Sequence, residues 1–303
     1  NNQADTATTG KGVGGGQIED SAVIAYRLAR LINCPVVATG EEDYVSDGTR
    51  VFAVPHGHPI MTAVTGTGCL LGAVLAAFFS AYYPCKNRLS IGEFLAYALA
   101  YYGLAGESAV QVSGVKPGSF SVAFIDALYS LGDAVLKSEN RIRPLVVPDQ
   151  LEVYFISGTQ DVELNENRLL SIVEDACRGG VTCFQFREKG AGTLVGQQKL
   201  ELAQQLKQIC AKYNVLYIIN DDVDLAVAVN ADGVHVGQED MSLESVRNLV
   251  GHKVVGISIH SVEELHKTDI IYADCVGVGH MYAKSTKPDA QEPCGPERVA
   301  ELQ

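Results

Sequence analysis

Short apolar runs alternate with helix-like segments in the second half of the chain, and this alternation constrains the fold more than any other feature. From the third run onward the strands begin about every 20 residues, with helical patterns in the gaps. Strands joined by helices form parallel sheets, so we expect an α/β barrel or a doubly wound sheet. An eight-stranded barrel would need further strands beyond Gln303. The runs expected to form strands are 151–157, 182–187, 215–220, 233–237, 253–258 and 275–279.

Several of these runs end on charged or amide residues. Gln185, Arg187 and Lys189 alternate, so their side chains point to the same side of their strand. Such a cluster could bind a phosphate or pyrophosphate, although a solvated surface pair is the alternative for any single charge. Asp221 and Asp240 follow two successive strands, and paired carboxylates favour a hard divalent cation. We therefore expect a phosphorylated or pyrophosphorylated small molecule together with Mg²⁺.

The remaining strand ends carry weaker signals. One residue of the Asn220–Asp222 run is expected to cap the following helix. His235 lies within a strand, where a core or supporting histidine is more common than a metal ligand. Ser258 ends the fifth strand, and the Ser/Thr-rich loop 283–288 with its two lysines follows the sixth. That loop fits a phosphate, with a plain solvated loop as the alternative.

Charge and cysteine usage exclude several classes of protein. Of the formal net charge of −13, most lies after Pro148, where 13 basic residues face 24 acidic ones. This balance argues against nucleic acid or an anionic membrane as a partner. The eight cysteines show no paired spacing, and four of them fall in apolar runs where burial is expected: Cys34, Cys177, Cys210 and Cys275. We expect a cytoplasmic protein without disulfides, a zinc site, a signal peptide or a membrane span.

The most informative stretch of the first half is 64–83, where a turn of small residues leads into a long apolar helix. Free N–H groups at such a helix start can bind an anion, and Gly66 and Gly68 let the backbone approach it. Cys69 would lie in the first turn, where the local field lowers the pKa of a thiol. Two interpretations remain open: an anion hole beside an attacking hydroxyl, and a tight turn before a buried helix.

Motifs in the second half resemble thiamine-phosphate synthase, a TIM-barrel enzyme. They are VYFISGTQD (153–161), FQFREKG (184–190), INDDVDLA (219–226), ADGVHVGQEDM (231–241), VGISIHS (255–261) and STKPDA (285–290). The resemblance covers residues 151–303. It implies Mg²⁺-dependent condensation of hydroxymethylpyrimidine diphosphate with hydroxyethylthiazole phosphate, which gives thiamine phosphate and pyrophosphate.

The same resemblance implies roles for individual residues. Asp221 and Asp240 would bind magnesium. Lys284, Ser285 and Thr286 would bind the thiazole phosphate, although Lys284 stands where a threonine is common. The pyrimidine diphosphate would be bound by Gln185, Phe186, Arg187, Glu188, Lys189, Asn220, Ser258 and Lys287.

Motifs in the first half are similar to those of hydroxyethylthiazole kinase, a family with a ribokinase-like α/β fold. They are ATGEED (38–43), VTGTGC (64–69) and KPGSFSVAFIDALY (116–129), and they cover only the C-terminal half of that fold. The resemblance implies phosphorylation of the thiazole alcohol with ATP and magnesium. Thr39 would contact ATP and Gly66 the thiazole, and Cys69 would take the place of the catalytic aspartate of related sugar kinases. Lys116 stands where this family usually has a glycine before the Pro-Gly-Ser-Phe motif.

These observations together predict a bifunctional enzyme of thiamine biosynthesis, since the kinase product is the synthase substrate. We expect a partial ribokinase-like domain (1–138), a linker (139–150) and a (βα)8 TIM barrel truncated after about six strands (151–303). We also expect a homo-oligomer that binds only small molecules, and weak substrate binding by the truncated chain. The alternatives are a synthase with a non-catalytic kinase-like part, a thiazole tautomerase-like enzyme, or a regulatory binding protein.

Overall fold

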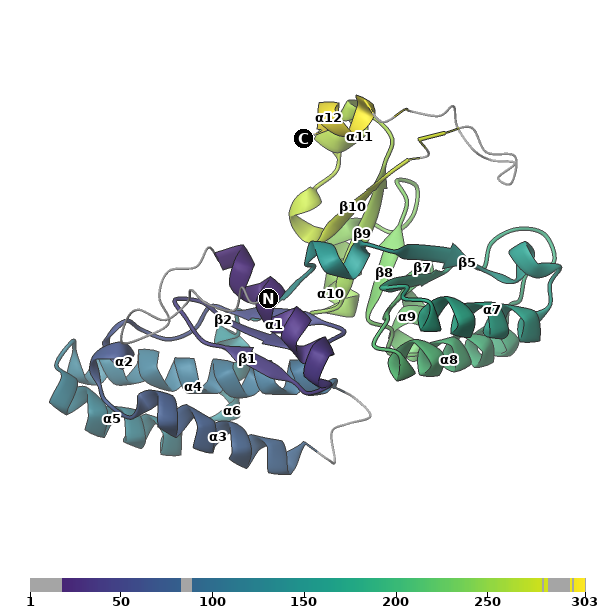
Figure 1. The fold of residues 1–303 in the computed structure, drawn as a ribbon. Coiled ribbons are helices and arrows are strands. Elements are labelled where there is room, and N and C mark those ends of the chain that lie inside the picture. Colours follow the sequence, from purple (N-terminus) through teal and green to yellow (C-terminus); the bar gives the residue numbers. More distant parts are fainter. Residues whose placement is uncertain (1–17, 83–88, 280, 283–294, 296, 303) are drawn as a thin grey trace, which may run out of the picture. The chain divides into compact units, whose positions relative to one another are not determined.

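The structure is a computed structural model that describes residues 18–82, 89–279, 281–282, 295 and 297–302 (Figure 1). The chain divides into two compact units, Asn1–Val147 and Pro148–Gln303. Each unit has its own sheet and its own hydrophobic core. Among the described helices, none is both long enough and apolar enough to cross a membrane.

The first unit contains a four-stranded antiparallel sheet in the order β1-β2-β3-β4. Its strands are β1 (Val36–Ala38), β2 (Asp43–Ser46), β3 (Val51–Val54) and β4 (Arg143–Leu145). Its helices are α1 (Ile18–Ile32), α2 (Ile60–Ala63), α3 (Thr67–Ala81), α4 (Ile91–Ser113), α5 (Pro117–Ser130) and α6 (Asp133–Glu139).

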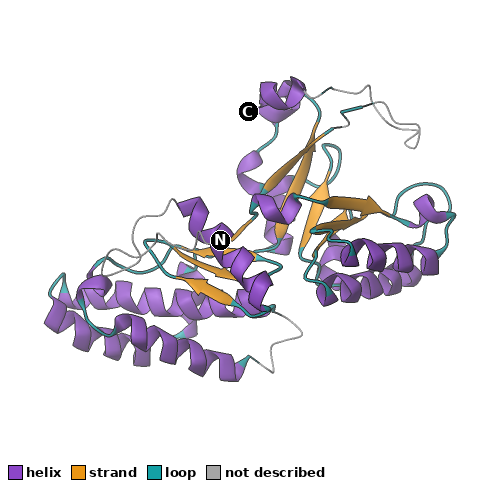
Figure 2. Ribbon diagram, in the orientation of Figure 1, coloured by secondary structure: helices purple, strands orange, loops and turns teal. Residues whose placement is uncertain are grey.

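Both faces of this antiparallel sheet are covered by helices (Figure 2). Successive side chains of a strand point to opposite faces, and all four residues of β3 are buried. Val51 and Ala53 pack in a cluster with Tyr26 of α1. Phe52 and Val54 pack in a second cluster, which includes residues of α3, α4 and α5. The unit is therefore a three-layer arrangement in which β3, a strand of the middle layer, is apolar throughout.

Part of the stretch expected to be a linker belongs to this sheet. β4 pairs with β3 through the register Phe52↔Pro144, and the short 3-10 helix η2 (Pro148–Leu151) follows it. Proline lacks an N–H group and is tolerated only at a sheet edge, which is where β4 lies. A three-residue strand that contains a proline carries almost no strand signal in the sequence.

The second unit is an α/β fold built on a six-stranded parallel sheet, as the alternation of strand and helix patterns predicted. The sheet forms a half-barrel with its strands in chain order: β5 (Tyr154–Ser157), β6 (Cys183–Phe186), β7 (Leu216–Asn220), β8 (Gly233–Val236), β9 (Val254–Ile259) and β10 (Cys275–Val278). Its helices are α7 (Glu166–Arg178), α8 (Gly196–Lys212), α9 (Val223–Ala228), α10 (Leu243–Val250), α11 (Val262–Lys267) and α12 (Glu297–Leu302), with 3-10 turns η3 (Thr159–Val162) and η4 (Ile270–Tyr272).

The core of this unit lies between the outer face of the sheet and the helices that cover it. α7 buries Leu169, Val173 and Cys177, which recur every four residues and so form one apolar stripe. The stripe belongs to the same cluster as Phe184 of β6 and Tyr217 of β7, both of which have no exposed surface. Burial of each large side chain contributes about 1.5–3 kcal/mol. This packing fixes the sheet and leaves the opposite, inner face of the strands available for function.

Three cysteines of the described residues are buried in this unit: Cys177, Cys183 and Cys210. Cys275 is half-buried, and Cys34 is exposed. The prediction that Cys34 is buried is therefore wrong, because it follows the end of α1 and lies before β1 begins.

Candidate active site at the strand ends

All six parallel strands point the same way, so their carboxyl ends gather polar residues at one edge of the half-barrel. Gln185 lies on β6 with 3% of its surface exposed, and its Nε2 donates to the Tyr154 hydroxyl at 3.0 Å. The next residue, Phe186, points into the outer core and is 1% exposed. The N–H of Arg187 donates to the Ser157 carbonyl at 3.0 Å, which extends the ladder by one residue. Arg187 therefore presents its half-buried side chain on the side of Gln185.

Lys189, Asp221 and Asp240 come together at this edge. The Lys189 Nζ donates to Asp221 Oδ2 at 2.9 Å, and this hydrogen bond raises the pKa of the lysine. Burial raises the pKa of the Asp221 carboxyl, and the Asp240 carboxylate beside it raises that pKa further. Asp240 is held in turn by the Gly237 N–H, which donates to its Oδ2 at 2.7 Å. Two carboxylates are thus held close together with one ammonium group to offset their repulsion.

This carboxylate pair fits a hard divalent cation. Carboxylate oxygens are the ligands that Mg²⁺ prefers, and Mg²⁺ is commonly bound by one or two carboxylates together with water and substrate phosphates. Burial raises the pKa of Asp221, the neighbouring Asp240 raises it further, and a bound cation would offset the repulsion between the two carboxylates. Across the part of the chain that the structure describes, no three His, Cys, Asp or Glu side chains gather into a complete metal-binding group. The pair would therefore hold a cation in an open site.

The run Asn220–Asp222 divides its roles between three residues. Asn220 is the last residue of β7 and is half-buried at the site. Asp221 has a left-handed backbone, with a φ of 61°. Asp222 is the helix cap: its Oδ1 accepts from the Leu225 N–H at 3.0 Å, and its Oδ2 accepts from Lys199 at 2.7 Å.

Glu188 ties the loop after β5 to the loop after β6. Its carboxylate accepts hydrogen bonds from the Thr159 N–H at 2.9 Å, from the Thr159 hydroxyl, and from the Leu194 N–H at 2.9 Å. Gln160 adds a fourth contact, because its Nε2 donates to the Arg187 carbonyl at 2.8 Å. The carboxylate of Glu188 is therefore committed to the protein and positions its neighbours.

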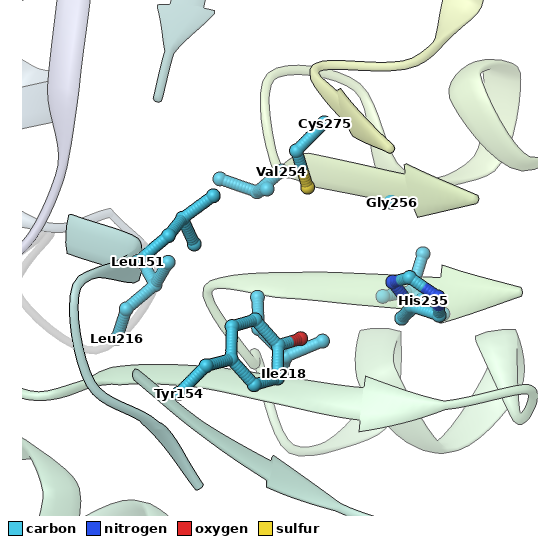
Figure 3. Close-up of a pocket in the computed structure, with 9 residues that line it drawn as sticks. Leu151, Tyr154, Leu216, Ile218, His235, Val254, Gly256 and Cys275 are labelled. Atoms are coloured by element: carbon cyan, nitrogen blue, oxygen red, sulfur yellow. The ribbon is translucent and has the colours of Figure 1, made fainter. Parts of the chain in front are cut away.

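The inner face of the sheet forms a mostly apolar cavity below these polar residues. Figure 3 shows His235 at the end of the cavity nearest the carboxyl ends of the strands, and Leu151, Leu216 and Cys275 toward their starts. His235 Nε2 lies 2.9 Å from the Ser258 hydroxyl oxygen. No pattern along the chain predicts that these two residues meet, because the contact joins residues on neighbouring strands that are 23 positions apart. The other lining residues are Tyr154, Ile218, Val234, Val254 and Gly256.

The candidates of the first unit lie at two helix or strand ends. Gly66 caps α3 with a φ of 99°, a left-handed conformation that favours glycine, and its Cβ position is open space. Cys69 is exposed in the first turn of α3, and Thr39 is exposed directly after β1. Leu71 is the only residue of α3 that is buried, so the interpretation of this helix as a buried one is wrong.

The remaining candidates are Lys116 and the four residues from Lys284 to Lys287. Lys116 is exposed and caps the start of α5 without a side-chain hydrogen bond. Four further candidates, Lys284, Ser285, Thr286 and Lys287, lie outside the described residues.

Family models and known proteins match both units. The model of the hydroxyethylthiazole kinase family matches residues 2–134, and that of thiamine monophosphate synthase matches residues 153–303. The thiamine biosynthesis bifunctional protein ThiM/ThiE of Symbiobacterium thermophilum is 36% identical over 91% of this chain and 55% of that protein. The thiamine-phosphate synthase of Geobacillus kaustophilus is 46% identical over 54% of this chain and 72% of that protein.

A solved structure, the thiamine phosphate pyrophosphorylase from Pyrococcus furiosus, is 28% identical with a TM-score of 0.43, over 51% of this chain and 70% of that one. The chain spans 55% of the length of the bifunctional relative. The order of the two matches along the chain is also the order in which the motifs occur in its sequence. The chain belongs to the thiamine-phosphate synthase family, and the segment ahead of the synthase match, residues 2–134, is similar to the hydroxyethylthiazole kinase family.

Proposed function

We propose that the second unit joins hydroxymethylpyrimidine diphosphate to hydroxyethylthiazole phosphate, giving thiamine phosphate and pyrophosphate. The observation that carries this proposal is the meeting of Lys189, Asp221 and Asp240 at the carboxyl edge of a parallel sheet. An ammonium group beside two crowded carboxylates suits a ligand that brings both an anion and a divalent cation. A tautomerase acting on a thiazole would have no use for this combination.

The residues at the strand ends divide the work of binding. Arg187 and Lys189 bind the diphosphate, the guanidinium by its fork of N–H groups and the ammonium by its charge. Asn220 and Ser258 donate hydrogen bonds to the same substrate, and Gln185 contacts it from the inner face of β6. Phe186 acts from the core, where it fixes the strand. Glu188 acts by tying the two loops together.

Asp221 and Asp240 would hold Mg²⁺, which would supply positive charge to the departing pyrophosphate. Lys189 donates to one oxygen of Asp221, which places its ammonium group beside the proposed cation site. Departure of pyrophosphate leaves a pyrimidine cation that the thiazole nitrogen attacks. The protein contributes position and electrostatic stabilisation, and no protein nucleophile is required. Lys284, Ser285 and Thr286 would bind the thiazole phosphate, and Lys287 the diphosphate.

The first unit supplies the thiazole phosphate by transferring a phosphoryl group from ATP. Thr39 contacts ATP, Gly66 contacts the thiazole, and Cys69 lies beside the attacking hydroxyl. The exposed first turn of α3 supports this assignment, since its N–H groups can reach an anion there. The first unit has a ribokinase-like fold, and the six described strands of the second are part of a TIM barrel. The proposal includes that the protein forms a homo-oligomer and is cytoplasmic.

A coupled assay tests both halves of this proposal. The protein is incubated with the thiazole alcohol, ATP, Mg²⁺ and the pyrimidine diphosphate, and thiamine phosphate is measured. Product from this mixture requires both activities. A parallel reaction starts from thiazole phosphate and omits ATP, so it requires the synthase alone. Product only in the second reaction would refute the kinase assignment, and product in neither would refute the synthase assignment.

A further inference from the structure

We propose that His235 is a positioning residue that sets the direction of the Ser258 hydroxyl. Its Nε2–H would donate to Ser258 Oγ and so leave the hydroxyl proton for an anionic substrate. This inference rests on the proposed function of the strand ends, where Ser258 meets the diphosphate. It adds a residue that touches no substrate but determines what the serine offers to one.

The imidazole of His235 occupies space left by two glycines, one on β9, which pairs with β8, and one on β10, which pairs with β9. A Cβ at Gly256 of β9 would lie 2.4 Å from His235 Nδ1, and a Cβ at Gly277 of β10 would lie 3.0 Å from its Cε1. Any other residue at Gly256 would collide with the ring. The ring therefore lies across the inner face of β9 and β10, and its Nε2 reaches Ser258 Oγ at 2.9 Å.

Ser258 is fixed from the same neighbouring strand at a second point. Gln238, two residues after β8 ends, donates from its Nε2 to the Ser258 carbonyl at 2.7 Å. Gln238 is itself oriented by the Thr268 hydroxyl, which donates to its Oε1 at 3.0 Å. These hydrogen bonds hold the backbone of Ser258, and His235 Nε2 is the partner of its hydroxyl.

His235 also connects the serine to the carboxylate pair. Its backbone carbonyl accepts a hydrogen bond from the Asp221 N–H at 2.8 Å. One residue of β8 thus contacts the ends of β7 and β9, which carry a proposed metal ligand and a proposed diphosphate ligand. A shift of His235 would therefore move both Asp221 and Ser258.

The direction of the hydrogen bond follows from the charge of the ligand. A serine hydroxyl has one proton and two lone pairs. If Nε2 accepted that proton, the lone pairs of Oγ would face the phosphate oxygens and repel them. If Nε2–H donates to Oγ, the hydroxyl proton is available to the phosphate, as charge-assisted binding of an anion requires. The Nε2–H form of His235 is therefore the form competent for binding.

A double-mutant cycle with His235→Leu and Ser258→Ala tests whether His235 affects substrate binding through the Ser258 hydroxyl. Each single variant is expected to raise the KM for the pyrimidine diphosphate about tenfold, the cost of one such hydrogen bond. The KM for thiazole phosphate should stay within about twofold. Because His235 acts through Ser258, the double variant should be no worse than Ser258→Ala alone. Full additivity of the two losses would overturn the proposal.

A conservative substitution separates hydrogen bonding from packing. His235→Gln places an amide N–H near the position of Nε2, so it should recover most of the loss seen in His235→Leu. Equal loss in the Gln and Leu variants would show a role in packing only. Tyr213→Phe serves as the control, since it removes a hydroxyl that bonds Glu174 at 3.0 Å on the helical side of the unit.

A spectroscopic test does not depend on activity. With ¹⁵N-labelled histidine, NMR should assign His235 as the Nε2–H form at neutral pH, and Ser258→Ala should shift its Nε2 signal. Assignment of His235 as the Nδ1–H tautomer would overturn the proposal. If the wild-type protein makes no thiamine phosphate, the proposed function fails while this measurement still decides the His235–Ser258 contact.

Discussion

Single residues at the strand ends carry opposing charges at short range, and their balance determines what the site can bind. Burial and the nearby Asp240 both disfavour the ionised form of Asp221, while Lys189 favours it. Removing either carboxylate would relieve the crowding but would also remove half of the candidate cation ligands. Removal of either carboxylate should therefore leave the fold as stable or more stable, and should weaken binding of the cation.

Asp221→Asn should keep the fold and lose synthase activity. The amide carries no charge, so repulsion with Asp240 disappears and the thermal midpoint should not fall. Binding of Mg²⁺ with the diphosphate loses one anionic ligand, for which we expect a loss of about 100-fold in kcat/KM. Steady-state kinetics across a Mg²⁺ titration measures the effect.

Asp175→Asn is the matched control for that variant. Asp175 is exposed on α7 and pairs only with the exposed Arg178, so kinetics should be unchanged. An Asp221→Asn enzyme with the wild-type Mg²⁺ dependence would rule out Asp221 as a metal ligand.

In the first unit, Asp43 makes stability depend on pH. Burial raises the pKa of its carboxyl from 3.8 to about 6. Between these values the unfolded chain releases the proton while the folded chain keeps it. The contribution of Asp43 to the free energy of unfolding is therefore greatest below pH 3.8, and it falls as the pH rises to about 6.

Asp43→Asn should abolish this contribution, because the amide does not titrate and its oxygen can still accept from the Gly40 N–H. The wild-type protein should lose about 2 kcal/mol relative to the variant between these pH values. Urea denaturation of both proteins at several pH values gives the difference. Parallel stability curves for the two proteins would contradict the assignment of the slope to Asp43.

At the scale of elements, the loops after β5 and β6 behave as one structure because Glu188 joins them. Glu188→Gln would place an amide NH₂ against the Thr159 N–H or the Leu194 N–H, so one donor loses its partner. We expect a loss of about 1–3 kcal/mol in stability and faster amide exchange over residues 188–194. The KM for the diphosphate should also rise, since Arg187 and Lys189 flank this residue.

Hydrogen exchange and thermal denaturation measure these effects. Glu201→Gln is the control, because the Glu201 side chain is exposed on α8 and accepts a hydrogen bond from Gln197 of the same helix. If exchange in the loop were the same in both variants, Glu188 would not be what orders it.

The parallel strands could be predicted from sequence because each is a buried run bounded by turn or charged residues. β8 shows this directly: residues from Gly233 to Val236 are apolar except for His235, and the strand ends at Val236, just before Gly237. The exposure of α3 could not be predicted, because a uniformly apolar helix carries no periodic stripe to mark which side is covered. β4 was missed for a similar reason, since Pro144 hides its strand character.

The candidate site was predictable only in part. Arg187 and Lys189 stand out because they alternate with Gln185 on one side of a strand, and Asp221 because it and Asp240 follow two successive strands. The contact between His235 and Ser258 depends on the register of β8 against β9 and on the space left by Gly256. A register of that kind is a property of the packed sheet, and no local pattern records it.

For the whole molecule, the arrangement of charge matters more than its total. The second unit lies in the acidic part of the chain, yet its site presents Arg187 and Lys189 to an anion. Long-range attraction of an anionic substrate is therefore weak, and selectivity depends on short-range contacts at the strand ends. Anions that lack a bound cation should be repelled by Asp221 and Asp240.

The edges of the two sheets differ in a way that affects behaviour at high concentration. In the part of the chain that the structure describes, β5 pairs only with β6 and β10 only with β9. Each therefore offers a row of backbone donors and acceptors to any strand that arrives, whereas Pro144 interrupts such a row on β4. Self-association in a concentrated solution of this chain would thus begin by strand addition at β5 or β10.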